Sequence, residues 1–125
     1  MKKSSGLYPH LVVDGTGRKV VSGAGGVLLT RTATAVGLDV ALSDALARWR
    51  RPFARHDPGK IVLDLALSLA IGGNCLADIA QLRAHPQVFG SVASDPTVSR
   101  CIDTPAADAP TALAAIAAAR AAARK

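Results

Sequence analysis

Glutamate is missing from this chain of 125 residues, since all nine of its acidic residues are aspartates. A site whose chemistry requires a glutamate therefore cannot be complete within the chain. Aromatic residues are also scarce, at 3% of the sequence, although half of all residues are hydrophobic. Alanine provides much of that half, so the sequence predicts a core of small and aliphatic side chains.

Cysteine is nearly absent as well. Cys75 and Cys101 are too few for a disulfide framework. Both stand in apolar patterns typical of helices, where a reduced cysteine packs as a small hydrophobic residue. This usage favours an intracellular, reducing compartment.

Long hydrophobic runs are missing too. The longest, Ile61 to Ile71, contains Asp64 and is about half a membrane span. Serine, glycine and proline interrupt residues 4–9, where a signal peptide needs an unbroken apolar stretch. We therefore expect a cytoplasmic protein without a membrane partner.

Length and composition indicate the class of protein. A chain of this length fits one small domain, and its hydrophobic content argues against global disorder. Alanine and leucine lose little free energy on entering a helix, so their abundance favours helical structure. We expect a mainly α fold, in which 15 lysines and arginines give a net charge of +6.

The first 22 residues differ in pattern from the rest. Two short β-branched runs, at residues 11–13 and 19–21, flank the dipeptide Asp14-Gly15. Asp-Gly is a strong signal for a hairpin because both central positions of a type I′ turn need a positive φ. We expect a short β-hairpin or an extended arm over residues 1–22. A helical domain over residues 23–125 then follows, with its last helix cut short.

Apolar residues recur at helical spacing through that domain. Gly37 is suited to end a first helix, and Asp39 to cap a second that carries Leu42 and Leu46. Helices are expected at about residues 27–36, from Asp39 to Trp49, and at about 58–71, 75–84, 96–103 and from 110 onward. The N-terminal caps of the later helices are expected at Asp57, at Asn74, and at Ser94 or Asp95. Pro105 is expected to stop the helix at about residues 96–103.

Neither nucleotide nor metal motifs are complete. The segment Gly23–Leu28 lacks the third glycine of a dinucleotide fingerprint, and Gly59-Lys60 lacks the rest of a phosphate loop. The three histidines are far apart, and no Cys-x-x-Cys or His-x-x-x-His pair exists. We attribute the glycines to turns and caps and expect no metal site.

Positive charge beside aromatic residues is the main functional signal. Four arginines fall within eight residues around Trp49 and Phe53: Arg48, Arg50, Arg51 and Arg55. Such a stretch can meet phosphates, and it can equally be a solvated loop. The segment Ser94–Asp103 has the form of a recognition helix, so residues 75–103 are expected to form a helix-turn-helix-like pair. Its connection is longer than the tight turn of a strict helix-turn-helix.

Longer segments of the sequence resemble one known family. They are Trp49-Arg50-Arg51-Pro52, His56-Asp57-Pro58-Gly59-Lys60, the run from Asp64 to Ala80, and Val92 to Arg100 with its Ser94-Asp95-Pro96-Thr97-Val98-Ser99-Arg100. In this order they resemble the N-terminal region of DDE-type insertion-sequence transposases. The group is the one named for insertion sequence thirteen-eighty, and the resemblance covers about residues 11–124.

The resemblance implies a helical region that binds the terminal inverted repeats of an insertion sequence in DNA transposition, a form of DNA recombination. In this family a following RNase H-like domain cuts and joins DNA, with two Asp and one Glu holding two Mg²⁺ ions. This chain has no glutamate, and Asp64 is expected to form a structural ion pair with Lys60. We therefore expect a chain truncated before the catalytic domain, which is non-catalytic alone and carries no cofactor.

The resemblance also implies which residues contact double-stranded DNA. They are Ser94, Thr97, Ser99 and Arg100 on the recognition helix, with Arg48, Arg50, Arg51 and Arg55 on the phosphate backbone. The alternative is a helical interaction domain. In that case the stripe of Leu113 and Ile116 in the last helix would mediate homo-oligomer formation or regulate the full-length transposase.

Overall fold

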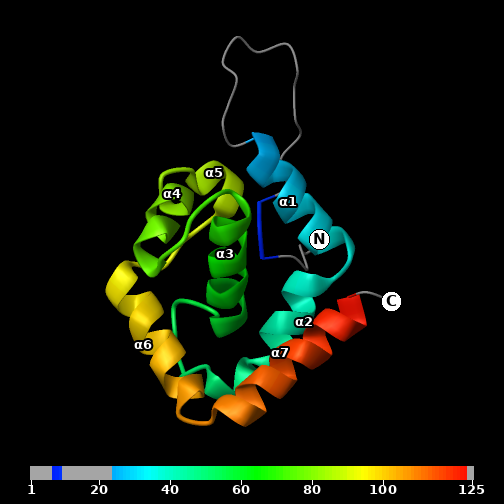
Figure 1. Ribbon diagram of the computed structural model, residues 1–125, viewed down its shortest axis with the longest axis vertical. Helices are drawn as coiled ribbons and strands as arrows, with labels where there is room; N and C mark the ends of the chain where they lie inside the picture. Colours follow the sequence, from blue (N-terminus) through cyan, green and yellow to red (C-terminus); the bar gives the residue numbers. More distant parts are fainter. Residues whose placement is uncertain (1–6, 10–23, 124–125) are drawn as a thin grey trace.

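The computed structural model describes residues 7–9 and 24–123, which form a bundle of short helices. Figure 1 shows α3 at the centre, with α1, α2 and α7 on one side and α4, α5 and α6 on the other. The mainly α fold is confirmed for these residues. The expected hairpin strands at residues 11–13 and 19–21 lie outside them.

Seven α-helices and two 3₁₀ turns make up this described part. In chain order they are α1 (Ala24–Ala35), α2 (Leu38–Ala45), η1 (Ala47–Trp49), α3 (Pro58–Ala70), η2 (Leu76–Ile79), α4 (Ala80–Arg83), α5 (Pro86–Phe89), α6 (Asp95–Ala106) and α7 (Ala109–Ala123).

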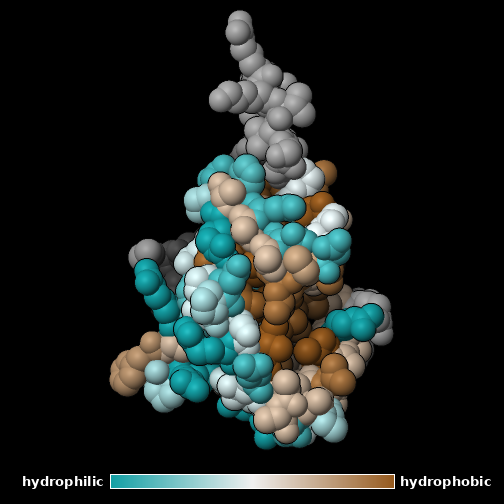
Figure 2. Space-filling model, turned by 60° about the vertical axis from the view of Figure 1, so that its left-hand side comes forward, coloured by the Kyte–Doolittle hydropathy of each residue, from teal (hydrophilic) through white to brown (hydrophobic). Residues whose placement is uncertain are grey.

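The core lies between α3 and the helices around it. Leu42 on α2, Leu67 on α3, Phe89 on α5 and Val98 on α6 are among its buried side chains. Most of its members are aliphatic, in keeping with the scarcity of aromatics. Figure 2 shows one face of the molecule, on which hydrophobic side chains form a strip between hydrophilic borders.

The start of α3 fits closely against α2. Asp57 accepts a hydrogen bond from the Gly59 amide at 2.8 Å and Pro58 occupies the first turn, so the expected cap is confirmed. A Cβ on Gly59 would lie 2.5 Å from the Ser43 backbone nitrogen, so only glycine allows this approach. The Ser43 hydroxyl also donates a hydrogen bond to Asp57. Asp57 therefore fixes both the start of α3 and its position on α2.

A buried polar cluster joins the segment Leu7–Pro9 to α3. The Tyr8 hydroxyl donates a hydrogen bond to one Asp64 oxygen at 2.5 Å, and Lys60 Nζ donates to the other at 2.8 Å. Burial raises the pKa of the Asp64 carboxyl, and the charge of Lys60 offsets only part of this effect. Burial, followed by the charge of Asp64, raises the pKa of Tyr8 far above its usual range. The expected pairing of Asp64 with Lys60 is confirmed, with Tyr8 as a third partner.

Asp39 does not cap α2, so this expectation is wrong. Gly37, in the left-handed conformation with φ 77°, precedes the helix, which already begins at Leu38. Asp39 is instead fully buried in the first turn, where it accepts hydrogen bonds from the Leu7 amide at 3.0 Å and the Thr34 hydroxyl at 3.3 Å. Its carboxylate thereby ties α1, α2 and the N-terminal segment together.

The expected helix at residues 75–84 is broken. The turn η2 precedes the four-residue α4, and Asp78 caps this turn by accepting hydrogen bonds from the amides of Asn74 and Cys75 at 2.7 and 3.1 Å. Asn74 is therefore not the cap. Cys75 is exposed and precedes this turn instead of lying on the apolar face of a helix, so the expectation that it packs there is wrong.

Pro105 does not stop α6, which ends at Ala106. The proline stands in the last turn, where it removes only its own amide, and the Ala107 amide still bonds to the Asp103 carbonyl at 3.2 Å. Helix α5 lies between α4 and α6 in the chain. The helix-turn-helix-like pairing of residues 75–103 stays a prediction.

No single helix within residues 24–123 is long and apolar enough to cross a membrane. The segments Gly25–Ala35 and Leu38–Ala45 reach the required length and apolarity only together, across a bend of 66°. Val27 and Leu42, one from each segment, are buried in the core.

Replacing Tyr8 with phenylalanine should lower the free energy of unfolding by roughly 1–3 kcal/mol, because a buried carboxylate loses a hydrogen-bond donor. Chemical denaturation followed by circular dichroism measures the change. Thr32→Val is the control, since its hydroxyl bonds to the Leu28 carbonyl at an exposed position. It should cost less than about 0.5 kcal/mol. Equal losses in both variants would contradict a specific role for the Tyr8–Asp64 contact.

Candidate nucleic-acid interface

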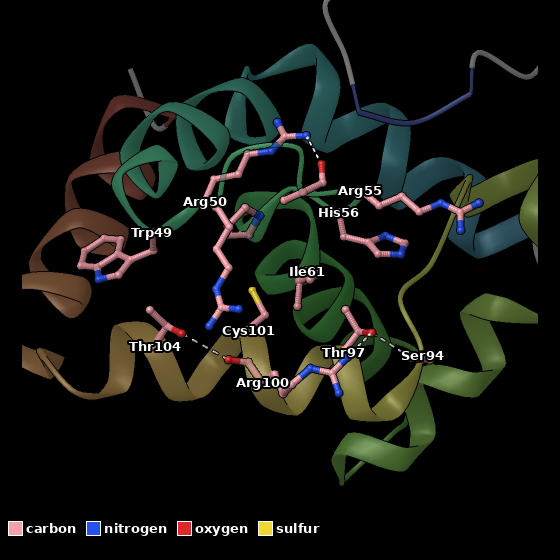
Figure 3. Close-up of a pocket in the computed structure, with 13 residues that line it drawn as sticks. Trp49, Arg50, Arg55, His56, Ile61, Ser94, Thr97, Arg100, Cys101 and Thr104 are labelled. Carbon is pink, nitrogen blue, oxygen red and sulfur yellow. Dashed lines mark hydrogen bonds between the residues drawn. The ribbon is translucent and has the colours of Figure 1, made fainter.

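The arginine-rich loop and helix α6 face one another across a hollow of about 500 Å³. The loop side runs from Trp49 to Pro58, and the α6 side runs from Ser94 to Thr104 (Figure 3). Six of the eight predicted DNA contacts line it: Arg50, Arg51, Arg55, Ser94, Thr97 and Arg100. Segments more than 35 positions apart in the sequence thus form one surface, which we call the basic hollow.

Helix α6 is held in place by contacts at its start. Arg83 donates hydrogen bonds to the Ala93 carbonyl at 2.9 Å and to Asp95 at 2.8 Å. Lys60 Nζ donates to the Ser91 carbonyl at 3.0 Å, which ties the preceding loop to α3. Val98 is completely buried beneath the helix. These anchors fix the orientation of α6, so that the face with Ser94, Thr97 and Thr104 lies toward the loop.

The side chains on that face form a short polar row. The Ser94 hydroxyl donates to the Thr97 hydroxyl at 3.0 Å, and Arg100 donates to the same Thr97 oxygen at 3.3 Å. Thr104 lies one further turn along and bonds to the Arg100 carbonyl at 3.5 Å. Hydroxyls and a guanidinium in this arrangement can bond to phosphate oxygens or to base edges.

The loop opposite is braced by Arg50. Its guanidinium donates a hydrogen bond to the Ala54 carbonyl at 3.2 Å and lies 3.8 Å from Asp57. Arg50 therefore has a structural role in addition to its charge. Arg51 and Arg55 are exposed and form no salt bridge with a described residue, so their charges remain available to an anion.

The charged side chains that line the hollow are all positive, because they are arginines and no carboxylate is among them. Burial lowers the pKa of His56, and the charges of Arg55 and Lys60 lower it further, so the imidazole is neutral at pH 7. Burial raises the pKa of the Cys101 thiol, with a further contribution from the charge of Asp57. The hollow therefore suits a polyanion such as a nucleic-acid backbone.

Two predicted contacts lie outside the hollow. Arg48 stacks over the ring of Trp49, 5.0 Å from its centre, and Ser99 is exposed elsewhere on α6. Seven lining residues are absent from the predicted set, among them His56 and Thr104. Thr104 follows Thr97 by seven positions and Arg100 by four, and this helical spacing identifies it once α6 is known to continue past Asp103.

The described residues do not fit a Mg²⁺ site. They contain no group of three histidine, cysteine or acidic side chains placed to hold a metal ion. Asp39 and Asp64 are engaged with backbone, hydroxyl and ammonium donors, and Asp57 caps α3.

The family model for the transposase DDE domain, group 1, matches residues 3–123. This match includes both sides of the basic hollow. No curated protein and no solved structure matches the chain.

DNA affinity should increase as the pH falls through the lowered pKa of His56, because its protonation adds a positive charge to the basic hollow. Below about pH 6.5, the ordinary pKa of histidine, we expect a gain of a few-fold, and at most about tenfold, from this group. Fluorescence anisotropy with a labelled duplex measures the gain. His56→Gln should remove this part of it, whereas His85→Gln, outside the hollow, should not. An unchanged pH profile in His56→Gln would overturn the assignment.

Proposed function

We propose that this chain, which belongs to the family of group 1 transposase DDE domains, is the DNA-binding N-terminal part of such a transposase. It recognises the terminal inverted repeats of an insertion sequence, and its partner is double-stranded DNA. The observation that carries this proposal is the basic hollow, where two segments distant in sequence converge on a surface lined by four arginines and no carboxylate.

The two sides of the hollow have different tasks in this proposal. Arg51 and Arg55 neutralise phosphates, which gives affinity without sequence information. Arg100 and the hydroxyls of Ser94 and Thr97 lie at the N-cap and in the first two turns of α6, the part of a recognition helix that contacts base edges. A guanidinium is well suited to guanine, to which it can donate two hydrogen bonds.

We infer further that the chain does not cut DNA by itself. A two-metal site needs three converging carboxylates, and in the family one of these is a glutamate, which this sequence lacks. Incubation of supercoiled plasmid with the protein and Mg²⁺ should leave the plasmid intact. Nicking that Asp64→Asn abolished would overturn this inference.

A second candidate function, an interaction domain, is favoured by an apolar hollow of about 230 Å³ between α6 and α7. Leu113 and Ile116 of α7 line it, together with Ile102 and Pro105 of α6. Leu113 is 65% exposed, while α7 packs on the rest of the fold through Ala112 and Ala119. An apparent mass that increases with protein concentration in sedimentation, together with a lack of DNA affinity, would favour this second function, either as self-association or as docking on the full-length transposase.

The DNA-binding proposal predicts different effects from the two sides of the basic hollow. Arg100→Ala should reduce discrimination between the inverted repeat and a scrambled duplex by about 1–3 kcal/mol. Arg55→Ala should weaken both complexes alike and lower the slope of log affinity against log salt by about 0.9. Gel shifts over a range of salt concentrations measure both quantities.

Arg120→Ala is the matched control, because this exposed arginine on α7 does not line the basic hollow. It should leave both discrimination and salt slope close to the wild-type values. A wild-type protein without preference for the repeat at any salt concentration would contradict sequence-specific recognition.

A further inference from the structure

Phe53 is fully exposed at the tip of the loop on one side of the basic hollow, with a relative accessibility of 106%. It occupies a β-turn in which the Ala54 amide bonds to the Arg51 carbonyl at 3.1 Å. Pro52 takes the second position of this turn and Phe53 the third. The sequence has only two phenylalanines, and the other, Phe89, is buried in the core.

The backbone at Phe53 is strained. Its φ is +62°, the only positive value at a non-glycine residue of the described chain. The third position of a turn with positive φ there normally carries glycine or asparagine, because a bulky side chain crowds the neighbouring carbonyl. A fully exposed ring recovers none of this cost by burial. Strain of this kind is found at functional sites, where the surrounding structure holds it.

The structure around Phe53 holds the turn. Arg50 donates to the Ala54 carbonyl at 3.2 Å and lies 3.8 Å from Asp57, so the loop is tied to the start of α3. Arg51 is the first residue of the turn, Arg55 follows its last residue, and both line the basic hollow. The ring is thus held at the rim of a cationic surface, with Pro52 exposed next to it.

We propose that Phe53 inserts into the base stack of the duplex that the basic hollow binds, and this rests on the proposed function. Apolar side chains that enter between base pairs unstack them and kink the duplex, while neighbouring cations hold the phosphates. The loop supplies both components within the five residues from Arg51 to Arg55. Arg51 and Arg55 bind the backbone on either side of the contact, and Phe53 with Pro52 forms the wedge.

Duplex DNA fits this surface better than a protein or a lipid partner does. Arg51 and Arg55, in the same loop as the ring, match the phosphates of a duplex, and an apolar side chain next to them can enter a base step between the two phosphate backbones. An aromatic residue that docks in a protein pocket has no need of flanking cations. The proposal therefore commits to duplex DNA and leaves the other partners as outcomes of its test.

The test uses duplexes with the sequence that the protein enriches from a randomised pool, each carrying 2-aminopurine at a single position. Fluorescence of this base rises when it is unstacked. We expect binding of the wild-type chain to raise the emission several-fold at one step or two adjacent steps. Phe53→Ala should abolish the rise while the complex still forms, and Phe53→Leu should retain part of it.

Two controls separate the wedge from effects on folding. Phe53→Gly relieves the positive φ, so it should melt at a higher temperature than the wild type and still fail to raise the emission. Leu69→Ala removes an exposed apolar side chain of α3 that lines neither hollow, and it should leave the rise unchanged.

The outcomes distinguish this proposal from the proposed function. If the wild type binds but the 2-aminopurine emission rises at no position, the wedge is overturned and DNA binding stands. The same holds if Phe53→Ala raises the emission as much as the wild type does. Absence of binding by the wild type overturns the proposed function and the wedge with it. An apparent mass that rises with protein concentration in the wild type, but not in Phe53→Ala, would assign the ring to a protein contact and overturn the wedge. Wild-type binding to phosphatidylcholine vesicles would assign it to a lipid contact and also overturn the wedge.

Discussion

The carboxylate of Asp57 is the contact on which the site depends. It accepts hydrogen bonds from the Gly59 amide and the Ser43 hydroxyl, and it lies 3.8 Å from the guanidinium of Arg50. One side chain thereby starts α3, holds it to α2 and restrains the loop between them. Gly59 completes the arrangement, because any Cβ there would meet the backbone of α2. The charge of Asp57 contributes to the raised pKa of Cys101, yet the carboxylate does not line the hollow.

Fixing the loop at this point concentrates positive charge opposite α6. Four guanidinium groups line one hollow without a carboxylate, an arrangement that costs free energy through repulsion in the isolated protein. Binding of a polyanion relieves this repulsion and releases the counterions of the nucleic acid. The positive φ of Phe53 is a second local cost, at the rim of the same surface. The fold supports both through contacts that lie behind the hollow, at Asp57, Arg83 and Lys60.

Sequence reasoning predicted the helical class, the cap at Asp57 and the pairing of Asp64 with Lys60, because these depend on local spacing and composition. It misplaced Asp39 and Cys75, since Asp39 is bonded to Leu7, 32 positions away, and Cys75 precedes a turn capped by Asp78 instead of lying within a helix. Pro105 was expected to end α6, which hid Thr104 as a lining residue. The strain at Phe53 was not predicted, because sequence preferences place glycine or asparagine, and not phenylalanine, at the turn position with positive φ.

The central claim is that the loop and α6 form a single DNA-binding surface. Amide hydrogen exchange, compared with and without a bound duplex, tests this most directly because it reports on both segments at once. We predict slower exchange at residues 50–56 and 94–104 together, with α7 unchanged. Protection confined to only one of these segments, or located on α7 instead, would contradict the account.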